Sequence, residues 1–196
     1  KSTISKFFVD ENPDFAGLQE VTHSQLSYLS QSLVDYSFIG VGRDDGKTKG
    51  EYSPVFYNKK KYKVLFHDTF WLSPTPEKVS VGWDASMERI CTYGLFENIL
   101  SKEKIWFFNT HFDHIGNDAR KNSTDLILKI GQAAIQYSLK YPESNSEHNL
   151  YISHRIKASN GDFIKILAHT QPYEIDKKGY ITKFLVIFSN ISFVDT

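Results

Sequence analysis

Two spacings of apolar residues alternate along the first two thirds of the chain. Apolar residues three or four positions apart predict helices, and short apolar runs bounded by turn-forming residues predict strands. The polar segments 42–50 and 74–82 are predicted loops. Segment 58–61 is rich in lysine and is predicted to be a hairpin turn. Helices are expected at 4–8, 22–33 and 118–140, and strands at 15–20, 38–41, 55–57, 62–72, 90–96 and 105–110.

Two local signals mark helix ends in the first part of the chain. Pro13 should end the first helix, because proline removes a hydrogen-bond donor and restricts the residue before it. Thr22 is followed three residues later by Gln25, the pattern of a capping box. The sequence therefore predicts that a second helix begins directly after Thr22.

The last quarter of the chain has a different pattern. Helical spacing is absent from residue 150 onward, and strands are expected at 150–158, 163–173 and 180–191 with turns at 160–161 and 176–179. These segments predict an antiparallel meander. The polar stretch 141–149 is the expected boundary, which divides the chain into residues 1–140 and residues 141–196.

Composition narrows the class of protein. The 196 residues include 23 Lys and Arg and 23 Asp and Glu, so a zero net charge argues against a basic protein that binds nucleic acid over its whole surface. The single cysteine excludes an intrachain disulfide and a multi-cysteine zinc site. The chain has no apolar run of about 18 residues, so the sequence predicts no membrane-spanning helix. The compartment stays open, with the cytoplasm slightly favoured.

Polar and charged side chains cluster at the ends of several predicted strands. The cluster at 109–114 holds two histidines, an aspartate and an asparagine within six positions. A glutamate that closes a buried strand can offer an oxygen ligand to a hard divalent cation. The four segments are Gly17–Val21, Gly50–Tyr57, Gly82–Asp84 with Arg89, and Asn109–His114.

Each of these residues also has an ordinary structural interpretation. Glu20 could be a surface or capping residue, and Glu51 a solvated loop carboxylate. Asp84 and Arg89 could form a salt bridge with each other. His111 could be a core histidine whose hydrogen bonds are satisfied. Taken one at a time, the residues leave these alternatives open.

In this order and at these spacings, the four segments resemble the endonuclease/exonuclease/phosphatase family of metal-dependent phosphoesterases. The resemblance covers about residues 1–130 and is greatest for a bacterial branch. That branch carries GLQEV, a G-E-x-x-P-x-F-Y segment, FWLS followed by GWD, and NTHFDH with an arginine shortly afterwards. In this chain the motifs stand at 17–21, 50–57, 70–73 with 82–84, and 109–114 with Arg120.

The resemblance implies a role for each position. Glu20 would bind Mg²⁺ or Mn²⁺. His111 would donate to the phosphate oxygens, and Glu51 would hydrogen-bond the imidazole and favour its charged form. Arg89 would contact the substrate phosphate or support the His–Glu pair. The other implied site residues are Asn109 and Asp113 on the pocket floor, and Asp84, Tyr52 and His114 beside the substrate.

The implied fold is α/β (α+β), a partial four-layer α/β sandwich followed by the antiparallel β-meander. Three family elements are not matched: an asparagine on a strand before Lys1, a G-D-x-N segment after the helix that ends near Lys140, and a terminal Asp-His pair. Gly161-Asp162-Phe163 is interpreted as a hairpin turn, since Ile164 stands where asparagine would be required. Metal affinity and turnover are therefore expected to be weak.

Residues of about 148–192 resemble the C-terminal half of a PAS domain. The resemblance rests on 154–163, 174–179 and 187–192. It implies a sensor or interaction module without catalysis as the alternative to an enzyme, and no heme or flavin ligand can be assigned.

Partners and substrate stay open at this point. The family acts on DNA, RNA, inositol phosphates and sphingolipids, so nucleic acid and small phosphate esters both fit. A partial four-layer sandwich leaves one face of a β-sheet without the layer that would normally cover it. The C-terminal strands or a second copy of the chain would cover it, which keeps oligomerisation open.

Overall fold

The protein has a mixed α/β fold with two sheets. The computed structural model describes the backbone of residues 3–140, 149–157, 163–175 and 181–190, and the side chains of residues 3–136. Within these ranges the helices and strands are α1 (Thr3–Glu11), β1 (Phe15–Gly17), α2 (His23–Ser32), β2 (Tyr36–Ile39), β3 (Val55–Asn58), β4 (Tyr62–Trp71), β5 (Ile90–Asn98), β6 (Lys104–His111), α3 (Asn117–Lys140), β7 (Asn149–Lys157), β8 (Phe163–Ile175) and β9 (Ile181–Asn190).

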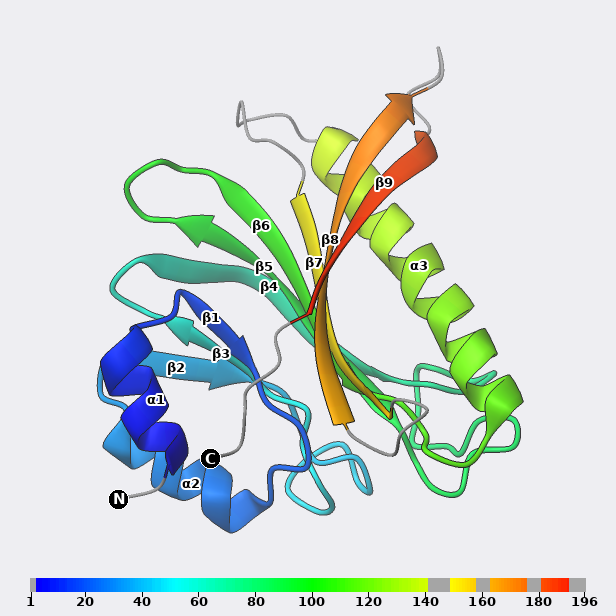
Figure 1. Cartoon of the computed structure of the whole chain (residues 1–196), viewed down its shortest axis with the longest axis horizontal. Helices are drawn as coiled ribbons and strands as arrows, with labels where there is room; N and C mark the ends of the chain where they lie inside the picture. Colours follow the sequence, from blue (N-terminus) through cyan, green and yellow to red (C-terminus); the bar gives the residue numbers. More distant parts are fainter. Residues whose placement is uncertain (1–2, 141–148, 158–162, 176–180, 191–196) are drawn as a thin grey trace.

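The strands form one small and one large sheet. The small sheet is antiparallel, with the order β1-β3-β2, and the large sheet has the order β4-β5-β6-β7-β8-β9 (Figure 1). Neighbours in the large sheet are antiparallel except for β6 and β7, which are parallel. Parallel neighbours need a crossover connection, and α3 lies within the connection between them.

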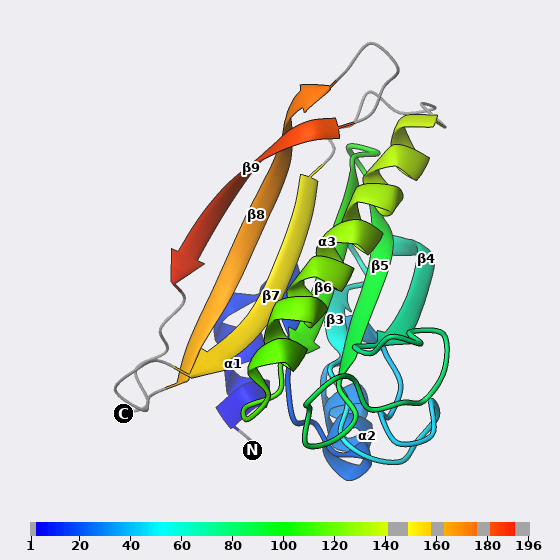
Figure 2. The same cartoon turned by 90° about the vertical axis from the view of Figure 1, so that its right-hand side faces the viewer.

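Three apolar clusters hold the elements together. Phe8 of α1 and Leu29 of α2 pack with Phe56 on one side of the small sheet. Val55 and Phe96 belong to a second cluster that joins the small sheet to the large one. A third cluster packs the buried side of α3 against the large sheet, which it crosses in Figure 2. Burial on both sides explains why the strands contain continuous apolar runs.

The predicted hairpin around residues 58–61 is wrong. β3 pairs with β1 and β2, whereas β4 pairs with β5, so the turn passes from one sheet to the other. Contacts with the first part of the chain hold the turn there: Asn58 donates to the carbonyl of Asp14, and the Lys61 ammonium lies 2.6 Å from the Asp14 carboxylate.

The first strand is shorter than the predicted segment 15–20, because the chain turns after Gly17. Glu20 adopts a φ of 58°, which lies in the left-handed region and not in the extended region that strands occupy. Hydrogen bonds on both sides hold it: Leu18 donates to the Pro54 carbonyl, and Val21 and Tyr52 bond each other through their backbones. Glu20 therefore lies in a constrained turn beyond the strand.

The C-terminal strands extend the large sheet. β7 pairs with β6 in register from Ile105 opposite Asn149 to His111 opposite Arg155. The idea that these strands cover a sheet face is therefore corrected: they add to its edge. The predicted turns at 160–161 and 176–179 lie outside the described residues, and the boundary at residue 141 stays a prediction. Among the described residues, no helix is long and apolar enough to span a membrane.

The predicted capping box at the start of α2 is confirmed. The Gln25 backbone N–H donates to the Thr22 hydroxyl, and the Thr22 N–H donates to the Gln25 side chain at 2.9 Å. We expect Thr22→Ala to lower the free energy of unfolding by about 1 kcal/mol, because a helix N–H loses its acceptor. Urea denaturation measures this, with Ser30→Ala on the exposed side of α2 as control. An equal effect of both substitutions would contradict the prediction.

Candidate active site

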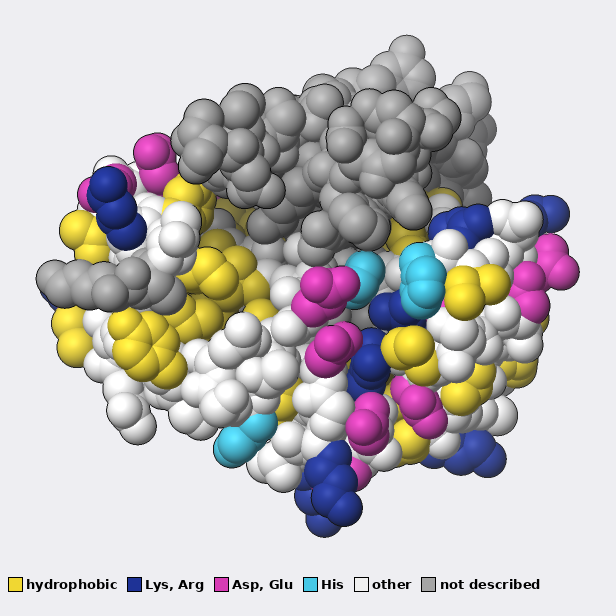
Figure 3. All heavy atoms as spheres, turned by 60° about the horizontal axis from the view of Figure 1, so that its bottom comes forward, with side chains coloured by type: hydrophobic (Ala, Val, Ile, Leu, Met, Phe, Trp, Pro, Cys, Tyr) yellow, Lys and Arg dark blue, Asp and Glu magenta, His cyan; other side chains and the backbone are white. Residues whose placement is uncertain are grey.

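Strand ends of both sheets meet at one edge. β1, β2, β4 and β6 finish there, while β3 and β5 begin there. The antiparallel registers show this within each sheet, because Gly17 and Ile39 both lie opposite Val55, and Cys91 lies opposite Thr110. Figure 3 shows acidic, basic and histidine side chains gathered in the middle of the face that carries the connecting loops.

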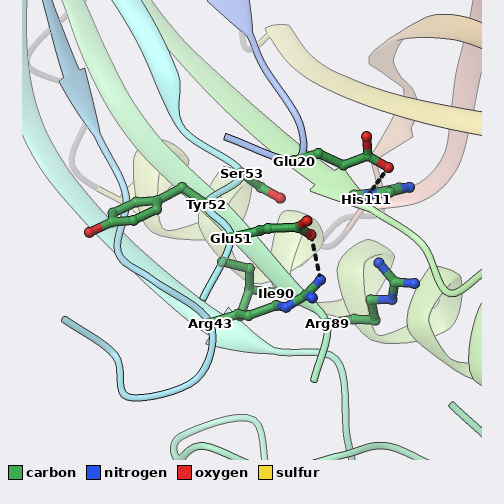
Figure 4. Close-up of a pocket in the computed structure, with 8 residues that line it drawn as sticks. All are labelled: Glu20, Arg43, Glu51, Tyr52, Ser53, Arg89, Ile90 and His111. Carbon is green, nitrogen blue, oxygen red and sulfur yellow. Dashed lines mark ion pairs between the residues drawn. The ribbon is translucent and has the colours of Figure 1, made fainter. Parts of the chain in front are cut away.

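These side chains line one groove of about 360 Å³. The groove unites Glu20, Glu51 and His111, which are distant in sequence and come from three different elements (Figure 4). A volume of a few hundred cubic ångströms suits a small organic ligand. The lining residues are Glu20, Arg43, Glu51, Met87, Arg89, His111 and His114.

Glu20 and His111 face each other across the groove. Nδ1 of His111 lies 3.8 Å from Oε1 of Glu20, with the imidazole 12% and the carboxylate 48% exposed. The left-handed conformation of Glu20 costs free energy of order 1–3 kcal/mol, and such residues are concentrated at functional sites. The surrounding backbone bonds hold the carboxylate toward the groove rather than along the strand.

Glu51 also lines the groove, but its salt bridge differs from the implied one. The resemblance implied a hydrogen bond to His111, whereas the ion pair observed joins the Glu51 carboxylate to Nη1 of Arg43 at 2.9 Å. The carboxylate that pairs with the His111 imidazole is that of Glu20. Arg43 therefore has to be added to the site.

Arg89 is held in the groove wall by Asp113. Its Nε donates to the Asp113 carboxylate at 3.2 Å, and both side chains are buried. Its Nη2 lies 3.0 Å from Nδ1 of His114. A guanidinium only donates, so this ring nitrogen is the acceptor in the contact. The alternative Asp84–Arg89 salt bridge is therefore wrong.

The Asp113 carboxylate organises the whole loop after β6. Besides Arg89, it accepts hydrogen bonds from the backbone and hydroxyl of Ser86 and from the backbone of Ile115 and Gly116. Burial alone would raise its pKa, but the hydrogen bonds from Gly116, Ser86 and Ile115 outweigh burial and hold the pKa well below its usual range. Asp113 is therefore an ionised positioning residue.

Asn109 lies beneath the groove and ties the two sheets together. It is fully buried, and its amide donates to the carbonyls of Leu18 and Pro54 at 2.7 and 2.9 Å. Its oxygen accepts from Gln19 at 2.6 Å. These bonds connect β6 to the two loops that carry Glu20 and Glu51, so Asn109 positions both carboxylates without lining the groove.

Two residues implied to contact substrate are engaged elsewhere. The Tyr52 ring points away from the groove (Figure 4), and its hydroxyl donates to the Lys47 carbonyl and lies 3.0 Å from Nδ1 of His23. The Asp84 carboxylate accepts from the backbone of Ala119 at 2.6 Å, which lowers its pKa. Asp84 thus stabilises the first turn of α3.

Sequence reasoning missed Arg43 and Ser53, which also line the inner end of the groove. Arg43 lies in the polar loop 42–50, where an arginine gives no signal beyond that of a solvated charge. Ser53 stands inside the G-E-x-x-P-x-F-Y segment, so its place beside Glu51 was the only available indication.

The groove has donor atoms of the type that hard cations bind. Glu20 and Glu51 present carboxylate oxygens, which suit Mg²⁺ or Mn²⁺ better than soft metals. Among the residues described by the structure, no group of three or more His, Cys, Asp and Glu side chains is placed to hold a metal. Gly161 and Asp162 lie outside those residues. The described part of the chain would therefore supply few ligands.

Comparison with known proteins gives a consistent class. No family model matches the chain. The endonuclease/exonuclease/phosphatase of Bacteroides vulgatus is similar at 39% identity and a TM-score of 0.69, covering 81% of this chain and 57% of that one. A mannosyl-6-phosphatase of Bacteroides thetaiotaomicron is similar at 37% identity and a TM-score of 0.66, covering 76% and 54%.

A curated relative is an uncharacterised protein of Acanthamoeba polyphaga mimivirus, 29% identical over 119 residues, or 57% of this chain and 44% of that protein. The chain thus spans about half the length of the proteins it matches. Its structural neighbours are endonuclease/exonuclease/phosphatase-family proteins. The comparisons do not support the resemblance of the C-terminal strands to a PAS domain, and β7 joins the same sheet as β6.

Proposed function

We propose that the chain carries the active site of a metal-dependent phosphoesterase of the endonuclease/exonuclease/phosphatase family, within part of its four-layer α/β sandwich. The observation that carries the proposal is the convergence of Glu20, Glu51 and His111 on one groove from three distant segments. The similarity at 39% identity to a solved member of that family supports it. Phosphate esters are the proposed substrate class.

Each side chain has a function in this proposal. A divalent cation at Glu20 would neutralise charge that builds up on the phosphate. The His111 imidazole donates to a non-bridging oxygen, and Arg89 presents a fixed positive charge from the groove wall. Asp113 and Asn109 hold these groups in place, so little reorganisation is needed during the reaction. Turnover should be slow, because the residues with described side chains supply few ligands to the cation.

The metal requirement is tested with Glu20→Gln, which keeps the shape of the side chain but removes its charge. We expect hydrolysis of a 4-nitrophenyl phosphate ester to depend on added Mg²⁺ or Mn²⁺ and to stop with a chelator. The substitution should raise the Mg²⁺ concentration for half-maximal rate by roughly tenfold or more, in line with the loss of a metal ligand. Magnesium titrations of the initial rate measure this shift.

The matched control is Glu11→Gln, at the exposed end of α1 and outside the groove. It should leave the magnesium titration unchanged. Hydrolysis that is indifferent to the chelator would contradict metal dependence. An unchanged titration in Glu20→Gln would remove Glu20 from the proposed cation site.

A further inference from the structure

Arg43 presents a guanidinium to the groove from a loop that no motif marked. Its side chain is 16% exposed and lines both the inner end and the open part of the groove, where Arg89 and His111 also lie. Figure 4 shows the Arg43 guanidinium joined to Glu51 by an ion pair, with the Arg89 side chain drawn to its right. Three nitrogen-bearing side chains therefore surround one small space.

The loop that carries Arg43 is rigidly folded. Both backbone polar groups of Arg43 are hydrogen-bonded. Its N–H donates to the Glu51 carbonyl at 3.2 Å, and its carbonyl accepts from the Trp71 indole at 2.8 Å. Gly50 has a φ of +79°, and a Cβ there would lie 2.2 Å from Oδ1 of Asp44. A loop closed this tightly holds the guanidinium in place before any ligand binds.

The guanidinium still has hydrogen-bonding capacity. Among the described residues, no acceptor lies within hydrogen-bond distance of the buried Nε of Arg43, since the carboxylate of Asp44 is 3.6 Å away. The salt bridge to Glu51 uses Nη1, and the Glu51 carboxylate is 38% exposed, so solvent weakens this pair. Buried donors are nearly always satisfied, so the long ion pair of this Nε with Asp44 and the solvated pair of Nη1 with Glu51 leave the guanidinium able to bind a further anion.

We propose that Arg43, Arg89 and His111 form a subsite for a terminal phosphate, so that the preferred substrates are phosphate monoesters of small molecules. This proposal rests on the proposed function and narrows its substrate class. A terminal phosphate carries about −1.5 to −2 charges at neutral pH and three free acceptor oxygens. A diester phosphate has one charge and two free oxygens, and so leaves one of the three donors unused.

The dimensions of the groove agree with this class. Its volume of about 360 Å³ holds a small molecule, not a long polymer segment. The zero net charge of the chain gives it no overall electrostatic attraction to a nucleic-acid backbone. Recognition therefore has to come from the local donors, with the planar guanidiniums suited to paired phosphate oxygens.

The test combines binding and kinetics on the whole chain. Calorimetry with inorganic phosphate measures the dissociation constant of wild type, Arg43→Gln, Arg43→Lys and the control Lys49→Gln. Lys49 is exposed on the same loop, and its substitution removes the same charge. We expect Arg43→Gln to weaken phosphate binding by roughly 10- to 100-fold, Arg43→Lys to weaken it less, and Lys49→Gln to leave it unchanged.

Kinetics then compare 4-nitrophenyl phosphate with bis(4-nitrophenyl) phosphate. We expect wild type to prefer the monoester, and Arg43→Gln to lower the ratio of the two kcat/KM values by about tenfold or more. Thermal denaturation checks that the variants fold, with Arg43→Lys as the variant that keeps the charge.

Several results would overturn the proposal. These are no binding of phosphate by wild type, equal binding by wild type and Arg43→Gln, or equal losses on both esters. Absence of all hydrolysis in wild type would instead overturn the proposed function, while the calorimetric comparison would still decide the role of Arg43.

Discussion

Replacing His111 by alanine is expected to lower the turnover of a phosphate ester by roughly 100- to 10,000-fold. The imidazole is held at the end of β6 and faces Glu20 across the groove, so its loss removes a donor from the place where negative charge develops. Binding of substrate should change less than turnover, because the arginines remain. Initial rates with saturating Mg²⁺ measure the effect.

His67→Ala is the matched control for this experiment. His67 is an exposed histidine on β4 and does not line the groove that holds His111. We expect it to keep wild-type turnover. Equal rates for wild type and His111→Ala would remove the imidazole from the reaction. Loss of folded structure in His111→Ala, measured by circular dichroism, would require the comparison to be repeated with His111→Gln.

Residue spacing and turn-forming residues predicted most of the helices and strands. The prediction failed where the same sequence pattern fits two different connections between strands. The turn at 58–61 is polar and short, as a hairpin turn would be, yet it connects different sheets. The parallel pairing of β6 with β7 leaves no turn motif at all, because a long helix separates the strands. Only tertiary packing decides these two cases.

The candidate site was predictable in part for a similar reason. Glu20 and His111 each follow an apolar run, and the ends of such strands tend to gather at a sheet edge, so their convergence follows from pattern and topology together. Arg43 also follows a predicted strand, at 38–41, but it opens a polar loop in which its charge could not be told from a solvated one. The contacts of Tyr52 and Asp84 depend on Lys47, His23 and the start of α3, and sequence spacing does not encode these distances.

Asp113→Ala is expected to have the largest effect on stability. The substitution removes the carboxylate that pairs with Arg89, whose side chain is 5% exposed, and leaves a buried positive charge with only the His114 ring nitrogen as a described side-chain acceptor. The backbone N–H groups of Ile115 and Gly116 lose their acceptor as well. We expect the free energy of unfolding to fall by about 3–5 kcal/mol. Urea denaturation at pH 7 measures it, and Asp125→Ala on the exposed surface of α3 should stay within about 0.5 kcal/mol of wild type.

The pH dependence separates loss of charge from loss of packing. Hydrogen bonds outweigh burial and depress the pKa of Asp113 in the folded state below its unfolded value of about 4. Its contribution to stability is therefore present above pH 4 and is lost as the pH falls toward the folded-state pKa. Asp113→Asn keeps the volume of the side chain but cannot ionise, so it lacks this contribution.

We expect the difference in unfolding free energy between wild type and Asp113→Asn to be greatest near pH 7. Below pH 4 it should shrink by up to about 1.4 kcal/mol per pH unit, since the unfolded wild-type chain takes up a proton that the folded chain does not. Denaturation series between pH 3 and pH 7 measure this. A difference that stays constant over that range would show that shape, rather than the ionised carboxylate, holds Arg89 at the groove.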